Sequence, residues 1–103
     1  MIKGFSKANF KKWLESKNPR TKVGFQQECS ACPLAKFVVQ TLPVEGKIEV
    51  TGDYLEIYNP DIPRAYHLPA WAQRFVELVD GTAYNNNSSV SAQKALKLLK
   101  KCA

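Results

Sequence analysis

The cysteine pair Cys29 and Cys32 has the spacing in this sequence that most resembles a chemical motif. A Cys-x-x-Cys pair can work as a redox dithiol or supply half of a zinc site. Pro33 follows the pair and predicts that a helix begins there, since proline suits the first helical position. A redox motif normally joins a strand directly to its helix, and no strand is predicted before Cys29. We therefore expect structural roles, with Cys32 as a helix cap and Cys29 as a buried apolar residue.

A cysteine-based redox or zinc-binding module is the alternative interpretation. Zinc takes about four ligands, usually cysteine and histidine. Four such residues are available if the fold brings them together: Cys29, Cys32, His67 and Cys102. A second closely spaced ligand pair is absent, however, and Cys102 shares a predicted helix face with leucines. The sequence thus predicts no cofactor, no metal and no enzymatic activity.

Lysine and arginine are concentrated at the two ends of the chain, which carries a net charge of +6. Residues 1–24 hold seven Lys or Arg against Glu15 alone, and residues 81–103 hold four lysines and no acid, whereas the segment between them is acidic. If the first and last helices lie side by side, their lysines can neutralise phosphates. Lysines in a last helical turn also simply complement the helix dipole. The predicted contact residues are Lys7, Lys11, Lys12, Lys94, Lys97 and Lys101.

No helix-turn-helix, zinc-finger or aromatic RNA-binding motif accompanies these lysines. The predicted function is therefore a small non-enzymatic binding module that contacts nucleic acid without sequence preference. An acidic protein partner is the competing interpretation, because it would meet the same positive charge. No small-molecule substrate is evident in the sequence.

Helical periodicity predicts the elements that position these residues. Ser6 is expected to cap a helix over residues 7–16, and a second helix follows from Pro33 to Leu42. Leu68-Pro69 opens a third helix, and Val90-Ser91 starts the fourth. Residues 20–28 have no clear period and are predicted to form a loop or one short extended piece. The predicted core residues are Phe10, Trp13, Leu34, Phe37, Val38, Ile48, Val50, Leu55, Ile57, Trp71, Phe75, Leu78, Val79, Leu96 and Leu99.

Alternating apolar residues on both sides of Gly52-Asp53 predict a β-hairpin in the middle of the chain. Its apolar side chains then share one face, while two glutamates oppose each other on the other face. The expected cross-strand pairs are Thr51–Tyr54, Val50–Leu55, Glu49–Glu56 and Ile48–Ile57. The predicted fold is one α+β domain of residues 1–103, in which four helices pack on one face of a small antiparallel hairpin sheet in the order α-α-β-β-α-α.

With these segments located, the chain resembles a group of small uncharacterised bacterial proteins. The shared segments are Cys32-Pro33-Leu34-Ala35-x-Phe37, the pattern LPxWAxxFVxxVD over residues 68–80, and Ser91-Ala92-x-x-Ala95-Leu96. Nearly every shared position is a predicted cap or core residue. The resemblance therefore supports the segmentation and implies no activity, cofactor or site residue.

The composition, 45% hydrophobic and 23% charged, is that of an ordinary globular protein. No apolar stretch approaches the roughly 18 residues of a membrane span. The first residues also lack the apolar core of a signal peptide. We therefore expect a cytoplasmic protein with no membrane partner.

Overall fold

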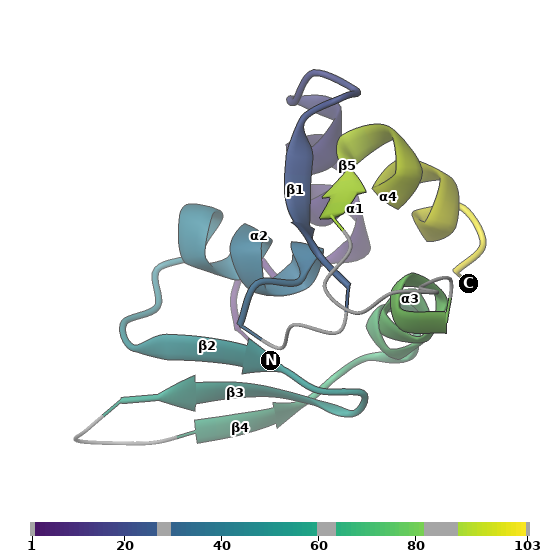
Figure 1. Cartoon of the computed structure of the whole chain (residues 1–103). Coiled ribbons are helices and arrows are strands. Elements are labelled where there is room, and N and C mark those ends of the chain that lie inside the picture. Colours follow the sequence, from purple (N-terminus) through teal and green to yellow (C-terminus); the bar gives the residue numbers. More distant parts are fainter. Residues whose placement is uncertain (1, 27–29, 60–63, 82–88, 103) are drawn as a thin grey trace.

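The computed structural model describes residues 2–26, 30–59, 64–81 and 89–102. Cys29, predicted to be a buried apolar residue, lies outside the described residues, and so do residues 60–63. The elements run in the order α1 (Lys7–Glu15), β1 (Lys22–Phe25), α2 (Pro33–Thr41), β2 (Lys47–Val50), β3 (Tyr54–Tyr58), β4 (Arg64–His67), α3 (Ala70–Gly81), β5 (Ser89–Ser91) and α4 (Ala92–Leu99) (Figure 1).

The described chain is a small α+β fold with four helices, but the predicted order α-α-β-β-α-α is wrong. The order is α-β-α-β-β-β-α-β-α, and the strands form a two-stranded sheet, β1-β5, and a three-stranded sheet, β2-β3-β4. The helices therefore do not cover one face of a single hairpin sheet. Helix α2 contacts both β1 and β2 and so lies between the two sheets (Figure 1). No helix in the described part of the chain is long and apolar enough to cross a membrane.

Strand β1 forms within the stretch in which the sequence shows no period. It pairs antiparallel with β5, joining Gly24 to Val90 and Phe25 to Ser89, with an irregularity in the register around Val23. Val23 and Val90 are buried, so each short strand is fixed by one apolar contact and by backbone pairing. A strand of three or four residues carries too little alternation to be recognised in the sequence.

The central hairpin is confirmed with the predicted register, including the opposed pair Glu49 and Glu56. Its turn is closed by Thr51, whose backbone N–H donates to the Tyr54 carbonyl oxygen at 2.9 Å. A third strand, β4, pairs with β3 and was not predicted. In β4 only Tyr66 is partly buried, so the alternating pattern that would indicate a strand is missing.

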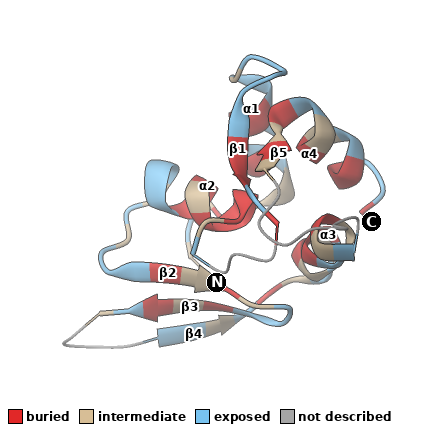
Figure 2. Ribbon diagram, in the orientation of Figure 1, coloured by how far each residue is buried: buried red, intermediate tan, exposed pale blue. Residues whose placement is uncertain are grey.

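Aromatic rings from three helices meet at the centre of one cluster of buried apolar residues. The ring of Phe10 lies 5.0 Å from Phe75, 5.3 Å from Phe37 and 6.0 Å from Trp71, measured between centroids. Figure 2 shows the buried positions on the helix and strand faces that point inward. The predicted core is confirmed, except that three of its residues are only partly buried and pack against the cluster: Trp71, Leu78 and Leu96.

Gly24 lies where β1 crosses the start of α2. A Cβ atom at this position would come within 2.5 Å of the Pro33 backbone nitrogen and 2.8 Å of the Ala31 carbonyl oxygen. These atoms belong to the backbone, so no side-chain rotation can relieve the overlap. The backbone of the neighbouring Phe25 is tied to the same segment, since its N–H donates to the Ala31 oxygen at 2.8 Å.

We expect Gly24→Ala to lower the free energy of unfolding by about 2 kcal/mol, because the added methyl group forces β1 away from α2. Urea denaturation measures the change. Gly52→Ala is the matched control, since a Cβ there meets no atom within 4 Å; its stability should change by less than about 0.5 kcal/mol. Equal stability of both variants would contradict the close approach of Gly24 to the backbone at the start of α2.

Candidate functional site

The two basic ends of the chain meet in the fold, because α1 packs against α4 (Figure 1). The Lys7 ammonium group donates a hydrogen bond to the backbone carbonyl of Cys102, just beyond the end of α4. The last carbonyls of a helix have no partner within it and carry the negative end of its dipole. Lys7 therefore links α1 to the segment that follows α4.

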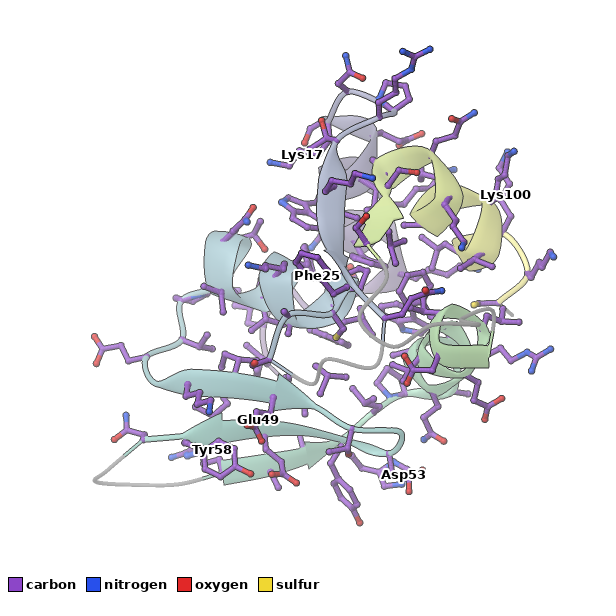
Figure 3. The ribbon with its side chains drawn as sticks, in the orientation of Figure 1. Lys17, Phe25, Glu49, Asp53, Tyr58 and Lys100 are labelled. Carbon is purple, nitrogen blue, oxygen red and sulfur yellow. The ribbon has the colours of Figure 1, made fainter. Side chains whose placement is uncertain are left out.

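A pocket of about 260 Å³ lies between α1 and α4, and we call it the α1–α4 pocket. Leu96 and Leu99 supply apolar surface, and the other lining residues are three lysines, Lys7, Lys11 and Lys100. No acidic side chain of the described residues lines it. This arrangement can hold an anionic group beside a small apolar one. Lys100, labelled in Figure 3, was not in the predicted set of contact residues.

The structure separates the other predicted lysines from this pocket. Lys12 lines a wider groove between α1 and α2, together with Lys3 and Trp13. Three lysines of α4 and its end recur at helical spacing, so they form a separate stripe: Lys94, Lys97 and Lys101. Lys97 and Lys101 are exposed, whereas Lys94 is half-buried. Of the six predicted residues, only Lys7 and Lys11 therefore share one pocket.

Another group of lysines surrounds Trp13. A pocket of about 190 Å³, which we call the β1 pocket, is lined by lysines from three segments: Lys17 after α1, Lys22 of β1 and Lys36 of α2. Phe25 lines the same pocket and keeps 40% of its surface exposed. The Lys17 ammonium nitrogen lies 5.4 Å from the centroid of the Trp13 ring, a cation–π contact.

The sequence did not predict that the residues of the β1 pocket lie together. The available signal was the density of basic residues before β1, but Phe25 lies in a stretch without periodicity. Lys36 lies among core residues of α2, so its place at the surface beside β1 depends on how two separate elements pack.

The lysines of both pockets belong to no ion pair among the described residues. The described residues contain two ion pairs, Lys47–Glu49 at 3.4 Å and Arg74–Glu77 at 3.1 Å, and neither involves a lysine of these pockets. Most described acidic side chains belong to the three-stranded sheet, its flanking turns and α3: Glu45, Glu49, Asp53, Glu56, Glu77 and Asp80. Figure 3 accordingly places the labelled Lys17 and Lys100 far from the labelled Glu49 and Asp53.

The exposed face of the three-stranded sheet is acidic and aromatic. Glu49 opposes Glu56 across the strands, and the Tyr58 hydroxyl donates a hydrogen bond to the Glu56 carboxylate. This hydrogen bond is the main cause that raises the pKa of Tyr58 to about 12, because it favours the protonated phenol. The two carboxylates on this face disfavour phosphate, although Lys47 pairs with one of them, Glu49, at 3.4 Å.

Cys32 is the N-cap of α2, as predicted. Its sulfur accepts a hydrogen bond from the Ala35 backbone N–H at 3.5 Å. Cys32 also borders a cavity of about 250 Å³ between α2, the β2–β3 turn and α3, whose lining is mainly apolar and includes Asp80. The observed contact is the one that a capping side chain makes with the first turn of a helix.

The residues of the zinc interpretation belong to separate elements. Cys32 begins α2 and His67 ends β4, where its ring packs edge-on against Tyr54 with centroids 5.2 Å apart. Cys102 is buried beyond α4, and its thiol donates to the Leu98 carbonyl at 3.5 Å. Across the described residues, no group of three or more His, Cys, Asp or Glu side chains is placed to hold a metal ion. The fourth predicted ligand, Cys29, lies outside the described residues.

No protein-family model, curated protein or solved structure matches the chain. A function for this protein therefore has to be proposed from the geometry and charge of its own residues.

The Cys102 thiol should react slowly in the folded protein. Burial raises its pKa, and the nearby charges of Lys7 and Arg74 offset this only in part. Since the thiolate is the reactive form, we expect alkylation of Cys102 by iodoacetamide at about pH 8 to be at least about tenfold slower than in urea-unfolded chain. Mass spectrometry of the C-terminal peptide measures both rates. Equal rates would contradict the buried position of this thiol.

Proposed function

We propose that this protein is a non-enzymatic module that binds nucleic acid through the phosphate backbone. The observation that carries the proposal is the α1–α4 pocket, where the packing of two helices brings Lys7, Lys11 and Lys100 around one space. Lysines grouped around one pocket favour a ligand with closely spaced negative charges. A nucleic-acid backbone is such a ligand.

The lysine stripe on α4 extends this surface. Lys97 and Lys101 are exposed and can reach phosphates on either side of the one held at the pocket. Interactions of this type fix the position of a nucleic acid but do not read its bases. The proposed binding is therefore weak, without sequence preference and strongly dependent on salt.

An acidic protein surface is the competing partner, and it would also respond to salt. Counterion release distinguishes the two partners. For nucleic acid, the logarithm of the binding constant falls linearly with the logarithm of the salt concentration. Each lysine–phosphate interaction that a substitution removes lowers the magnitude of this slope by about 0.9. An acidic protein lacks the condensed counterions that produce this slope, so the same substitution would not change it by this amount.

We expect the double variant Lys11→Gln, Lys100→Gln to weaken binding to a random-sequence duplex and to lower the magnitude of the salt slope by about 2, since two lysine–phosphate interactions are removed. Fluorescence anisotropy between about 50 and 200 mM salt gives both quantities. The matched control is Lys47→Gln, Arg64→Gln, which removes the same charge from the three-stranded sheet. Its slope should equal that of the wild type.

Two results would contradict the proposal. The first is no binding of duplex or single-stranded nucleic acid at about 50 mM salt, where phosphate interactions are strong; this would leave an acidic protein as the partner. The second is an equal change of slope in both double variants, which would show that net charge, and not the α1–α4 pocket, determines binding.

A further inference from the structure

We infer that the β1 pocket binds an unpaired nucleotide, so that the preferred ligand is single-stranded nucleic acid. This inference rests on the proposed function and names the class of nucleic acid and a second binding site. It depends on a feature that phosphate binding alone does not require, namely an exposed aromatic ring among lysines.

The charge at the β1 pocket matches a nucleotide phosphate. Lys17, Lys22 and Lys36 approach the same 190 Å³ space from three segments of the chain, and no acidic side chain of the described residues lines it. The Lys17 ammonium lies over the Trp13 ring and takes no part in the two ion pairs of the described chain. Because lysines that line one space carry like charges, an anion bound in that space lowers their energy.

The ring of Phe25 supplies the surface for a base. Its neighbours Val23 and Gly24 are buried, whereas Phe25 is 40% exposed. The backbone of Phe25 is fixed on two sides, by its hydrogen bond to Ala31 and by its pairing with Ser89. A fixed phenylalanine ring offers no hydrogen-bonding atom, so it favours a partner that stacks. Every nucleobase can do so, which makes such stacking tolerant of sequence.

Duplex nucleic acid does not fit this pocket in the same way. The internal bases of a duplex are stacked on one another and cannot cover an isolated ring without leaving the helix, which costs free energy. An unpaired strand has free base faces. It can therefore place a phosphate at the lysines and a base on Phe25 together, and this combination gives the preference for a single strand.

The groove between α1 and α2 offers further positive charge near the β1 pocket. Trp13 borders both, and the groove adds Lys3 and Lys12 at its walls. A single strand that stacks on Phe25 can thus continue past Trp13 to further positive charges. The groove gives Lys12 a role that the α1–α4 pocket does not provide.

The test compares a single-stranded oligothymidylate of about 12 nucleotides with a blunt duplex of the same length. Phe25→Leu keeps an apolar side chain but removes the ring. We expect it to weaken binding of the single strand about tenfold and to change binding of the duplex less than about twofold. Tyr54→Leu is the matched control, because it removes an exposed ring from the acidic sheet; both affinities should stay unchanged.

A spectroscopic measurement tests the same site without altering it. Trp71→Phe leaves Trp13 as the single tryptophan. Addition of the oligothymidylate should quench the fluorescence of Trp13, because a base bound in the β1 pocket lies beside that ring. Lys22→Gln, Lys36→Gln should reduce the quenching at a given concentration, since both substitutions weaken phosphate binding.

The outcomes separate this inference from the proposed function. Equal affinity for both nucleic acids, with no effect of Phe25→Leu, would overturn the inference and leave phosphate binding at the α1–α4 pocket intact. If Phe25→Leu weakened the binding of polyglutamate as much as that of oligothymidylate, the inference would also be overturned, because a peptide has no bases to stack. Failure to bind either nucleic acid would overturn both, whereas a selective loss of single-strand binding together with Trp13 quenching would support the inference.

Discussion

The burial of Phe10 is the interaction on which the arrangement of the lysines depends. Its side chain is fully buried among rings from α2 and α3, so it fixes the rotation of α1 about its own axis. Successive helix residues point about 100° apart. Once Phe10 faces inward, Lys11 lies about 100° to one side, and Lys12, about 200° round the helix, points away from the core and slightly towards the other side. The structure shows this division, since Lys11 lines the pocket with α4 and Lys12 lines the groove with α2.

Separation of charge follows from the same packing. The helices and strand formed by the ends of the chain carry lysines that belong to neither ion pair of the described residues, while the three-stranded sheet and α3 carry most of the described acidic residues. Like charges on one surface repel and lower the stability of the folded chain. A bound polyanion would remove that repulsion on one side of the molecule. Phosphate would be repelled on the other side, where Glu49 and Glu56 face each other.

The elements that depend on residues close together in the chain were predicted correctly from the sequence. Ser6, Cys32 and Ser91 cap their helices, and the hairpin around Gly52 has the expected register, because caps and turns depend on neighbouring residues. Strand β1 was predicted only as one of two alternatives, a loop or one short extended piece, and β4 and β5 were not predicted, since each strand is short and held mainly by pairing with another segment. The same limit applies to the site. From the sequence, contact between the two basic ends was stated only as a condition for phosphate binding. Phe25 and Lys36 line one pocket because β1 packs against α2, and this packing is visible only in the structure.

Mapping of backbone amide shifts by NMR during titration with a short single-stranded oligonucleotide at low salt tests the central claim most directly. The claim is that the α1–α4 pocket and the β1 pocket bind nucleic acid. It predicts the largest shift changes at the amides of Lys11, Lys100 and Phe25, with little change at Tyr58 on the acidic sheet. Changes concentrated on β2–β4, or no changes at all, would contradict it.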